Sequence, residues 1–494
     1  MQRLLFSIIT FLSFLPLMHA QSMLTTDMAW ERTDYPKRET RAVWLGTIGG
    51  IDWPRHKVQN GRGIEAQKQE LRNMLDELER VHINTVILQT RIRGTVIYPS
   101  DIEPWDDCMT GRKGIGPGYD PLAFAIDECH KRGMELHAWV VCIPVGSVQK
   151  QKAYGSQSIL KRQPKLCKIS SGEVFMQPSQ PGTATYIASI CREIAQRYDI
   201  DGISLDYIRY PEAMYHFTDK CTPTERRANI TRIVQAVHDQ VKAIKPWVKL
   251  SSSPIGKHRD LSRYTSRGWN CYDAVWQEPQ EWLKKNLQDM LFPMMYFQGD
   301  HFYPFLYDWQ ENAYGHPVIP GLGIYFLSPT EGRWELNDVR AQLYTARRSG
   351  IGGFCFYRSE FLVRNCKGLY DCVADELDPY PALTCRMTWM GDTLAPSAPT
   401  QITLSGSTLS WTPADTSEWV CYNLYASDTY PVDVDRAENL VKARILSTSL
   451  PLPAEALVRR YYAVTAQDRY GNESAPIQEP ERKLNYKNTH LQSK

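Results

Sequence analysis

Eight short apolar runs, separated by longer segments of helical periodicity, are the feature that most limits how residues 36–380 can fold. Runs that are apolar at nearly every position are typical of parallel strands buried on both faces. Their alternation with helical segments favours a parallel sheet with helices packed outside it. Eight such units predict a (β/α)8 TIM barrel, with an open doubly wound sheet as the alternative. The predicted strands cover residues 41–47, 83–90, 135–143, 202–208, 248–253, 290–296, 318–325 and 351–357.

Signals for helix starts and ends support this pattern. Asp120 can cap a helix whose first turn holds Pro121 and which Gly133 ends. Thr222 and Glu225 have the spacing of a capping box, in which each side chain bonds the other residue's backbone N–H. The segments between the apolar runs are therefore predicted to be helices that pack on the barrel.

The chain changes character after Asp378, where Pro, Ser and Thr become frequent. Over residues 396–480, short alternating strands follow one another without helical segments, which predicts a small all-β sandwich. The segment 461–474 resembles the late strand and turn of fibronectin type III domains. Such a unit is either a glycan-binding or docking module or a spacer packed on the barrel.

Residues 1–20 have the pattern of a secretory signal peptide. Arg3 supplies a positive start, residues 4–18 are apolar, and Ala20 is a small residue at the predicted cleavage point. We therefore expect an exported protein, periplasmic or extracellular. The apolar run is too short for a stable membrane span, and no later stretch predicts one.

The charge composition argues against polyanionic partners. The chain has 57 Lys and Arg against 55 Asp and Glu, a formal net charge of +2. Since nucleic-acid binding depends on a strongly basic surface, we expect no nucleic-acid partner. The 14 Trp and 27 Tyr are more than a hydrophobic core alone needs, so some of these rings are expected to face a ligand.

The twelve cysteines predict few disulfides, because several of them lie in apolar helix or strand patterns. The sequence favours a bridge among Cys366, Cys372 and Cys385, since these three lie in a short, irregular segment after the last strand. No CxxC or HxxxH spacing is present, which disfavours zinc. We predict no metal site and no cofactor.

Polar and aromatic residues gather where the predicted barrel strands end, and reactive groups of TIM barrels project from those C-terminal ends. A sugar offers hydroxyl groups to polar side chains and an apolar face to aromatic rings, and glycosidic cleavage needs a carboxylic acid. This composition therefore favours carbohydrate chemistry. The residues found there are Asp52, Gln89, Arg91, Arg93, His137, Trp139, Asp206, Tyr207, Arg209, Glu212, Tyr296, Asp300, Tyr357, Arg358 and Glu360.

Asp206 is the strongest candidate for the catalytic acid. Strand alternation places it on the inner face of the barrel, at the mouth. Tyr207 or Tyr296 could donate a hydrogen bond that sets its ionisation. The alternative is that Asp206 pairs with Arg209 or Arg91 to hold loops together.

The second catalytic group is open between several candidates. Glu212 lies six residues after Asp206, and Asp52, Asp300 and Glu360 lie on other loops. An N-acetyl sugar can instead use its own acetamide as the nucleophile. The aromatic run at 302–309 is equally interpreted as packed core or as a sugar platform.

Seven stretches follow one another over most of residues 40–358, and the ordered set is far more specific than any one of them. They are Arg41-Ala-Val-Trp44, Ile51-Asp-Trp-Pro54, Tyr98-Pro-Ser with Glu103-Pro-Trp105, Gly118-Tyr-Asp-Pro-Leu-Ala-Phe124, His130-Lys-Arg-Gly-Met-Glu-Leu-His-Ala-Trp139, Tyr198-Asp-Ile-Asp-Gly202 with Leu205-Asp-Tyr-Ile-Arg-Tyr-Pro211, and Pro293-Met-Met-Tyr296. The set resembles the bacterial glycosyl-hydrolase-like family ten, barrel proteins exported to the envelope.

This resemblance implies a TIM-type barrel with a glycosidase site. Family members with known activity cut the glycan strands of peptidoglycan, particularly strands stripped of their peptides. By resemblance, Asp206 is the strand-four acid, and the cleft contains Arg91, His137, Trp139 and Tyr296.

The chain differs from many of these relatives at two places. Asp206-Tyr207 stands where they carry paired aspartates, and Cys142-Ile-Pro-Val145 stands where they carry Asn-Pro-Tyr-Arg. These differences bear on the substrate and on the second catalytic group.

We therefore predict an exported glycoside hydrolase that acts on N-acetylhexosamine-containing envelope glycan, with peptide-free peptidoglycan strands as the expected substrate. The alternatives are a non-catalytic glycan-binding barrel and a glycosidase for another polysaccharide. The predicted catalytic residues are Asp206, Glu212 and Tyr296. The predicted substrate-binding residues are Asp52, Gln89, Arg91, His137, Trp139, Tyr207, Arg209, Asp300, Tyr357 and Arg358. For His137, an interior histidine is as good an interpretation as a sugar contact.

Overall fold

The computed structural model describes residues 35–211, 219–414, 417 and 419–480 of the 494-residue chain. The predicted signal peptide at residues 1–20 and the candidate Glu212 lie outside these residues. From Pro36 onwards the chain forms one compact unit. Among the described residues, no helix is both long and apolar enough to cross a membrane.

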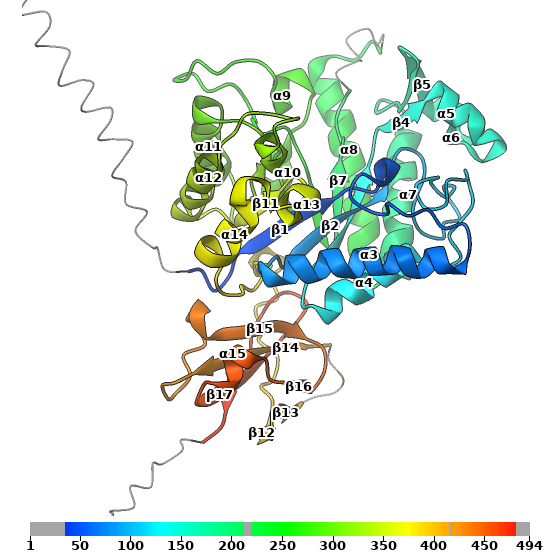
Figure 1. Ribbon diagram of the computed structural model, residues 1–494. Helices are drawn as coiled ribbons and strands as arrows, with labels where there is room; N and C mark the ends of the chain where they lie inside the picture. The colour runs from blue at the N-terminus through cyan, green and yellow to red at the C-terminus, as the bar shows by residue number, and fades with distance from the viewer. Residues whose placement is uncertain (1–34, 212–218, 415–416, 418, 481–494) are drawn as a thin grey trace, which may run out of the picture. The chain divides into compact units, whose positions relative to one another are not determined.

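Eight parallel strands form the central sheet, each within or overlapping one of the predicted runs (Figure 1). Their order along the sheet is β10-β11-β1-β2-β3-β7-β8-β9. The two outer strands meet through parallel bridges between Leu291 and Val318 and between Met294 and Gly321, which close the ring into a barrel. This closure rules out the open doubly wound sheet. The strands are β1 (Thr40–Leu45), β2 (Thr85–Arg91), β3 (Glu135–Val141), β7 (Gly202–Asp206), β8 (Lys249–Ser252), β9 (Met290–Leu291), β10 (Gly321–Leu322) and β11 (Gly353–Phe356).

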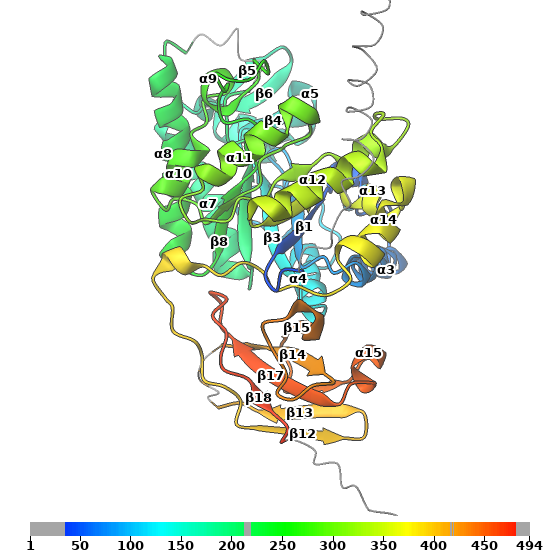
Figure 2. The same cartoon turned by 90° about the vertical axis from the view of Figure 1, so that its left-hand side faces the viewer.

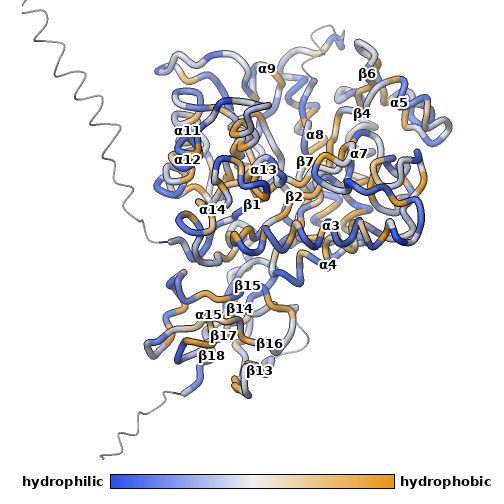
Figure 3. Tube along the Cα trace, in the orientation of Figure 1, coloured by the Kyte–Doolittle hydropathy of each residue, from blue (hydrophilic) through white to orange (hydrophobic). Residues whose placement is uncertain are grey.

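Helices cover the outside of the barrel in both views (Figures 1 and 2). Helix α3 (Gly61–Arg80) buries Leu71, Leu75 and Leu78, which share one face. Hydrophilic and hydrophobic stretches alternate along this helix in Figure 3, because one face meets solvent and the other packs on the strands. Other helices of this layer are α7 (Pro181–Arg197), α8 (Pro223–Lys242), α11 (Tyr303–Glu311) and α12 (Leu336–Ser349).

Both predicted helix caps are confirmed. Asp120 accepts the first backbone N–H groups of α4 (Pro121–Lys131), with Pro121 in the first turn. Thr222 and Glu225 form a complete capping box at the start of α8. These local bonds explain why the helix starts could be located from the sequence.

The aromatic run at 302–309 forms α11 and the residue before it. Phe302, Phe305 and Trp309 are fully buried, and the Trp309 indole N–H donates to the Gly256 carbonyl at 2.9 Å. These rings therefore belong to the core and not to a sugar platform.

The barrel carries an insertion between β3 and α7. The chain there forms a three-stranded antiparallel sheet in the order β4-β6-β5, with two short helices. The elements are β4 (Pro144–Ser147), α5 (Val148–Ala153), α6 (Ile159–Arg162), β5 (Cys167–Ser170) and β6 (Glu173–Met176).

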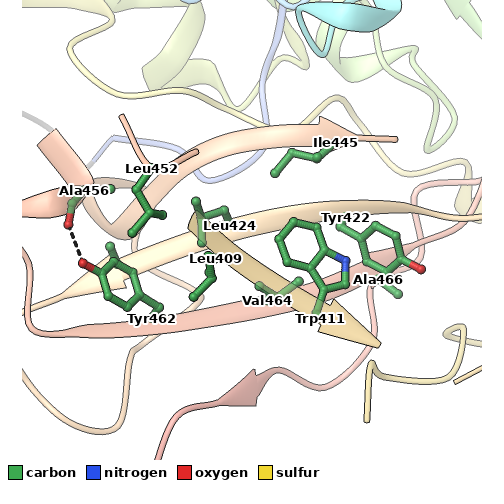
Figure 4. Packing of buried hydrophobic residues seen from close by; sticks show 11 residues of the cluster. Leu409, Trp411, Tyr422, Leu424, Ile445, Leu452, Ala456, Tyr462, Val464 and Ala466 are labelled. Atoms are coloured by element: carbon green, nitrogen blue, oxygen red, sulfur yellow. Dashed lines mark hydrogen bonds between the residues drawn. The ribbon is translucent and has the colours of Figure 1, made fainter. Parts of the chain in front are cut away.

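The C-terminal region folds as two small antiparallel sheets, β12-β13-β16 and β15-β14-β17-β18, which confirms the all-β prediction. One apolar core includes Trp411, Tyr422 and Leu424 (Figure 4). The buried Tyr462 hydroxyl donates to the Ala456 carbonyl at 3.0 Å. The resemblance to fibronectin type III domains stays a prediction. The strands are β12 (Gln401–Ser405), β13 (Thr408–Thr412), β14 (Cys421–Ser427), β15 (Leu440–Ile445), β16 (Ser449–Pro451), β17 (Tyr461–Gln467) and β18 (Ile477–Gln478).

The predicted bridge among Cys366, Cys372 and Cys385 is wrong, because all twelve cysteines are described and all are free. Cys372 Sγ lies 3.8 Å from a Glu376 carboxylate oxygen, and the Cys385 thiol donates to the Gly352 carbonyl at 3.2 Å. The thiols therefore face different partners, although they are close in the sequence.

An arginine of the C-terminal region is buried against the N-terminal ends of the barrel strands. Arg444 on β15 places its guanidinium 3.2 Å from a Glu135 oxygen and 2.7 Å from an Asp201 oxygen. Lys249 Nζ lies 2.6 Å from Glu135, and His130 lies 2.7 Å from Asp201. Unpaired buried charges are costly, so this cluster makes the barrel and the sandwich stabilise each other.

Arg444→Met is expected to lower the free energy of unfolding by about 3–5 kcal/mol, because Glu135 and Asp201 lose a buried partner. Arg444 has a φ of +54°, and methionine leaves that backbone cost unchanged. Chemical unfolding followed by tryptophan fluorescence measures the change. The control is Lys442→Met, on the same strand as Arg444, which removes a more exposed ion pair with Glu79 of α3. This substitution should lower the free energy of unfolding by under about 1 kcal/mol. Equal effects of the two substitutions would contradict the role of the buried cluster.

Candidate active site

A cavity of about 510 Å³ lies at the C-terminal ends of the barrel strands, within the roughly 300–1,000 Å³ of typical small-molecule sites. Part of the predicted site meets there: Gln89, Trp139, Asp206, Tyr207, Arg209, Tyr296, Tyr357 and Arg358. The other described lining residues are Gly46, Ile48, Ile51, Arg93, Val141, Trp269, Met294, Phe297, Tyr325 and Phe326. Across the described part of the chain, no group of three or more His, Cys, Asp or Glu side chains is arranged to hold a metal ion.

Asp206 ends β7 and carries the only carboxyl group among the described residues that line the cavity. Its Oδ2 accepts the Trp139 indole N–H at 2.9 Å, and its Oδ1 accepts the Tyr207 backbone N–H at 2.7 Å and the Ser253 hydroxyl at 3.1 Å. Burial raises the pKa of Asp206 and outweighs the charge of Arg209 and these three donors, which all favour the ionised form. The carboxyl group therefore keeps its proton to a higher pH than an ordinary aspartate.

The backbone after Asp206 turns sharply to make this arrangement. Tyr207 has a φ of +48°, which is uncommon for a residue other than glycine. The turn allows the Tyr207 N–H to bond the preceding side chain, and the Arg209 guanidinium lies 4.2 Å from the centre of the Tyr207 ring. Uncommon backbone conformations of this kind are concentrated at functional sites.

A cluster of aromatic rings forms one wall of the cavity. Tyr296 and Tyr357 stack with centroids 5.2 Å apart, and Tyr325 meets them edge-on at 5.8 and 5.7 Å. Burial raises the pKa of Tyr357 to about 12 and that of Tyr296 well above its usual value, and the charge of Asp206 adds to both shifts. Both phenols therefore stay protonated and can donate hydrogen bonds to a sugar.

Arg358 is bound by two carboxylates beside the cavity. It pairs with Asp52 and lies 2.7 Å from Glu360, while the second Asp52 oxygen accepts the Gly46 N–H at 2.7 Å. Burial raises the pKa of Asp52, although the charge of Arg358 opposes the shift. Asp52 and Glu360 thus act as ion-pair partners of Arg358, outside the cavity lining.

Gln89 holds the loop after β1 in place. Its side-chain oxygen accepts the backbone N–H groups of Thr47 at 3.0 Å and Ile48 at 2.8 Å. The Thr47 hydroxyl donates to the Gln89 carbonyl at 2.7 Å. Because the amide oxygen is used in this way, the amide nitrogen is the group that can contact a ligand.

The structure does not bring Arg91, His137 or Asp300 to the cavity. Arg91 is fully buried and makes two hydrogen bonds of 2.7 Å to Glu103. His137 is an interior residue 3.2 Å from Glu135, and Asp300 is exposed in the short helix Gly299–His301. Glu212 lies outside the described residues.

Several cavity rings were not among the predicted site residues. Trp269 is 46% exposed and lies on the loop before the short helix Cys271–Ala274. A tryptophan in a polar loop, outside any apolar periodicity, is a signal that could identify it. Tyr325 and Phe326 carry no such signal, because they lie at the end of an apolar run and resemble core residues.

Comparison with known proteins identifies the family. The model of the proteins described as "Glycosyl hydrolase-like 10" matches residues 39–322, more than half of the chain. This chain belongs to the glycosyl hydrolase-like 10 family. The match runs from the start of the barrel through β10 and so includes the segments that carry Asp206 and Tyr296 of this family member.

Two proteins that are similar in sequence to this chain are also named glycosyl hydrolases. "Glycosyl hydrolase YngK" of Bacillus subtilis (strain 168) is 28% identical over 484 residues, which cover 88% of this chain and 92% of that protein. "Glycosyl hydrolase DigH" of Escherichia coli (strain K12) is 31% identical over 294 residues, 54% of this chain and 67% of that protein. Among solved structures, the PgaB (BpsB) glycoside hydrolase domain from Bordetella bronchiseptica has a TM-score of 0.47 at 14% identity, over 68% of this chain and 98% of that one.

Trp139→Phe is expected to move the alkaline limb of the pH profile of kcat/KM for glycan hydrolysis to higher pH, by about one unit. The substitution removes a donor to the Asp206 carboxylate, which raises the pKa of the acid, and a general acid works only while protonated. Ser253→Ala removes another donor and should move the limb in the same direction. A limb that stays in place, or moves to lower pH, in both variants would contradict this assignment.

Proposed function

We propose that this protein is an exported glycoside hydrolase that cleaves N-acetylhexosamine-containing envelope glycan, with peptide-free peptidoglycan strands as its substrate. The observation that carries the hydrolase proposal is the buried Asp206 carboxyl group, whose pKa is raised by burial and which lies at the cavity beside a wall of tyrosines. The family membership and the names of the two relatives support it. The substrate class rests on the resemblance of the ordered barrel motifs.

In the proposed reaction, the Asp206 carboxyl group protonates the glycosidic oxygen as the bond from that oxygen to C1 breaks. The carboxyl group then becomes a carboxylate. Trp139, Ser253 and the Tyr207 backbone already point N–H and O–H groups at its oxygens. These donors stabilise the charge that develops during proton transfer without having to reorient.

The electron pair that forms the new bond to C1, in place of the glycosidic bond, has two candidate sources. The sugar's 2-acetamido oxygen can form the new bond to C1, with the Tyr296 and Tyr357 phenols available to orient it. Water then attacks C1, the bond from C1 to the acetamido oxygen breaks, and the Asp206 carboxylate takes back a proton from the water. Glu212 is the alternative, as a nucleophile or as the base that activates water. Products from glycans that carry a 2-hydroxyl group in place of the acetamide would favour Glu212.

Asp206→Asn is expected to lower kcat by about 10²-fold or more, because an amide cannot donate the proton. Tyr296→Phe should cause a smaller loss, since it removes a hydrogen bond and leaves the acid in place. The measurement is mass spectrometry of muro-oligosaccharides released from peptide-free and peptide-bearing strands. Asp127→Asn is the control, because this exposed carboxylate pairs with Lys131 away from the cavity.

The same experiment separates the alternatives. Binding of strands without products from the wild-type protein would favour a non-catalytic glycan-binding barrel. Products only from other polysaccharides would move the substrate away from peptidoglycan. Unchanged turnover in Asp206→Asn would remove this residue from the mechanism.

A further inference from the structure

Arg93 is presented to the cavity by a tight hairpin directly after β2. The Ile92 N–H donates to the Thr95 carbonyl at 2.9 Å, so Arg93 and Gly94 are the two residues at the tip. Gly94 has a φ of +69°, and a Cβ there would lie 3.1 Å from a Val145 methyl group. The tip is therefore packed against the β4 segment. This packing fixes the backbone from which the Arg93 side chain reaches the cavity lining.

The cavity contains three guanidinium groups and one carboxyl group among its described residues. Arg358 is already paired with Asp52 and Glu360, and Arg209 acts on Asp206. Arg93 is half-buried and has no hydrogen bond or ion pair with any described residue. A cation that lies at a binding cavity and is left unpaired by the described residues favours an anionic group on the ligand.

We propose that Arg93 is a specificity-determining residue that binds a carboxylate carried by the glycan, and that this is the lactyl carboxylate of N-acetylmuramic acid. The inference rests on the proposed function for its choice of sugar. In peptidoglycan that carries peptides, this carboxyl group is an uncharged amide. Removal of the peptide exposes it as an anion.

The chemistry of arginine fits this ligand. A guanidinium group offers two parallel N–H donors that match the two oxygens of a carboxylate, and the pair is stronger inside a cavity than in bulk water. An amide at the same position offers one oxygen and no charge. Arg93 therefore gives the site a means to prefer peptide-free strands over peptide-bearing ones.

The test compares three oligosaccharides of equal length. One alternates N-acetylglucosamine with N-acetylmuramic acid and has free lactyl carboxylates, one is the same chain with these groups converted to methylamides, and one contains only N-acetylglucosamine. Binding is followed by the fluorescence of Trp139 and Trp269, which line the cavity, and hydrolysis by mass spectrometry. The variants are Arg93→Gln, Arg93→Lys and the control Arg112→Gln, an exposed arginine outside the cavity.

We expect the wild-type protein to bind the free carboxylate form about 10- to 100-fold more tightly than the methylamide form. Arg93→Gln should reduce this affinity ratio to about one, because only binding of the free carboxylate form is weakened. Arg93→Lys should retain part of the ratio, and Arg112→Gln should leave it unchanged. Circular dichroism and the thermal midpoint check that the variants fold.

Three results would overturn the inference. They are equal affinity of the wild-type protein for the free carboxylate and methylamide forms, an affinity ratio that is unchanged in Arg93→Gln, and no binding of either form. The binding measurement separates its failure from that of the proposed function. Selective binding of the free carboxylate without hydrolysis would support the role of Arg93 and count against the hydrolase proposal. Hydrolysis of all three oligosaccharides with equal rates and affinities would support the hydrolase proposal and count against the role of Arg93.

Discussion

The carboxylate of Glu135, the first residue of β3, connects three distant parts of the chain. It accepts hydrogen bonds from Lys249 of β8, from Thr384 in the segment after the barrel and from Arg444 of the sandwich. Burial alone would raise the pKa of Glu135, but the neighbouring cations hold it well below its usual range. The charge is therefore present at neutral pH and has to be neutralised inside the protein. The packing of the sandwich on the barrel supplies part of that neutralisation.

The same cluster lies at the starts of the two strands that carry the proposed acid and its indole donor. Strand β3 begins at Glu135 and carries Trp139 four residues later on the same face. Asp201 immediately precedes β7, which ends at Asp206. The two strands are paired in parallel, with Val141 beside Asp206. Because strands in a closed barrel move little relative to each other, charges paired at one end help to hold the acid and its indole donor together at the other.

The pKa values of two buried carboxyl groups in this barrel shift in opposite directions for a simple reason. Glu135 has ammonium and guanidinium groups within hydrogen-bond distance, so the charged form is favoured in spite of burial. Asp206 receives hydrogen bonds only from neutral N–H and O–H groups among the described residues, and burial dominates. The first carboxyl group therefore stabilises the fold, and the second is suited to give up a proton.

The sequence by itself determined the eight strands, the helix caps and the all-β region, because periodicity and capping act between residues a few positions apart. It also placed Asp206 and Trp139 correctly at the cavity, since both lie on strands whose alternation is regular. Only the tertiary structure decided that Arg91 faces Glu103 while Arg93 faces the cavity, and that no disulfide joins the cysteines. Those outcomes depend on the paths of loops and on ion pairs between distant residues, and neither leaves a local pattern in the sequence.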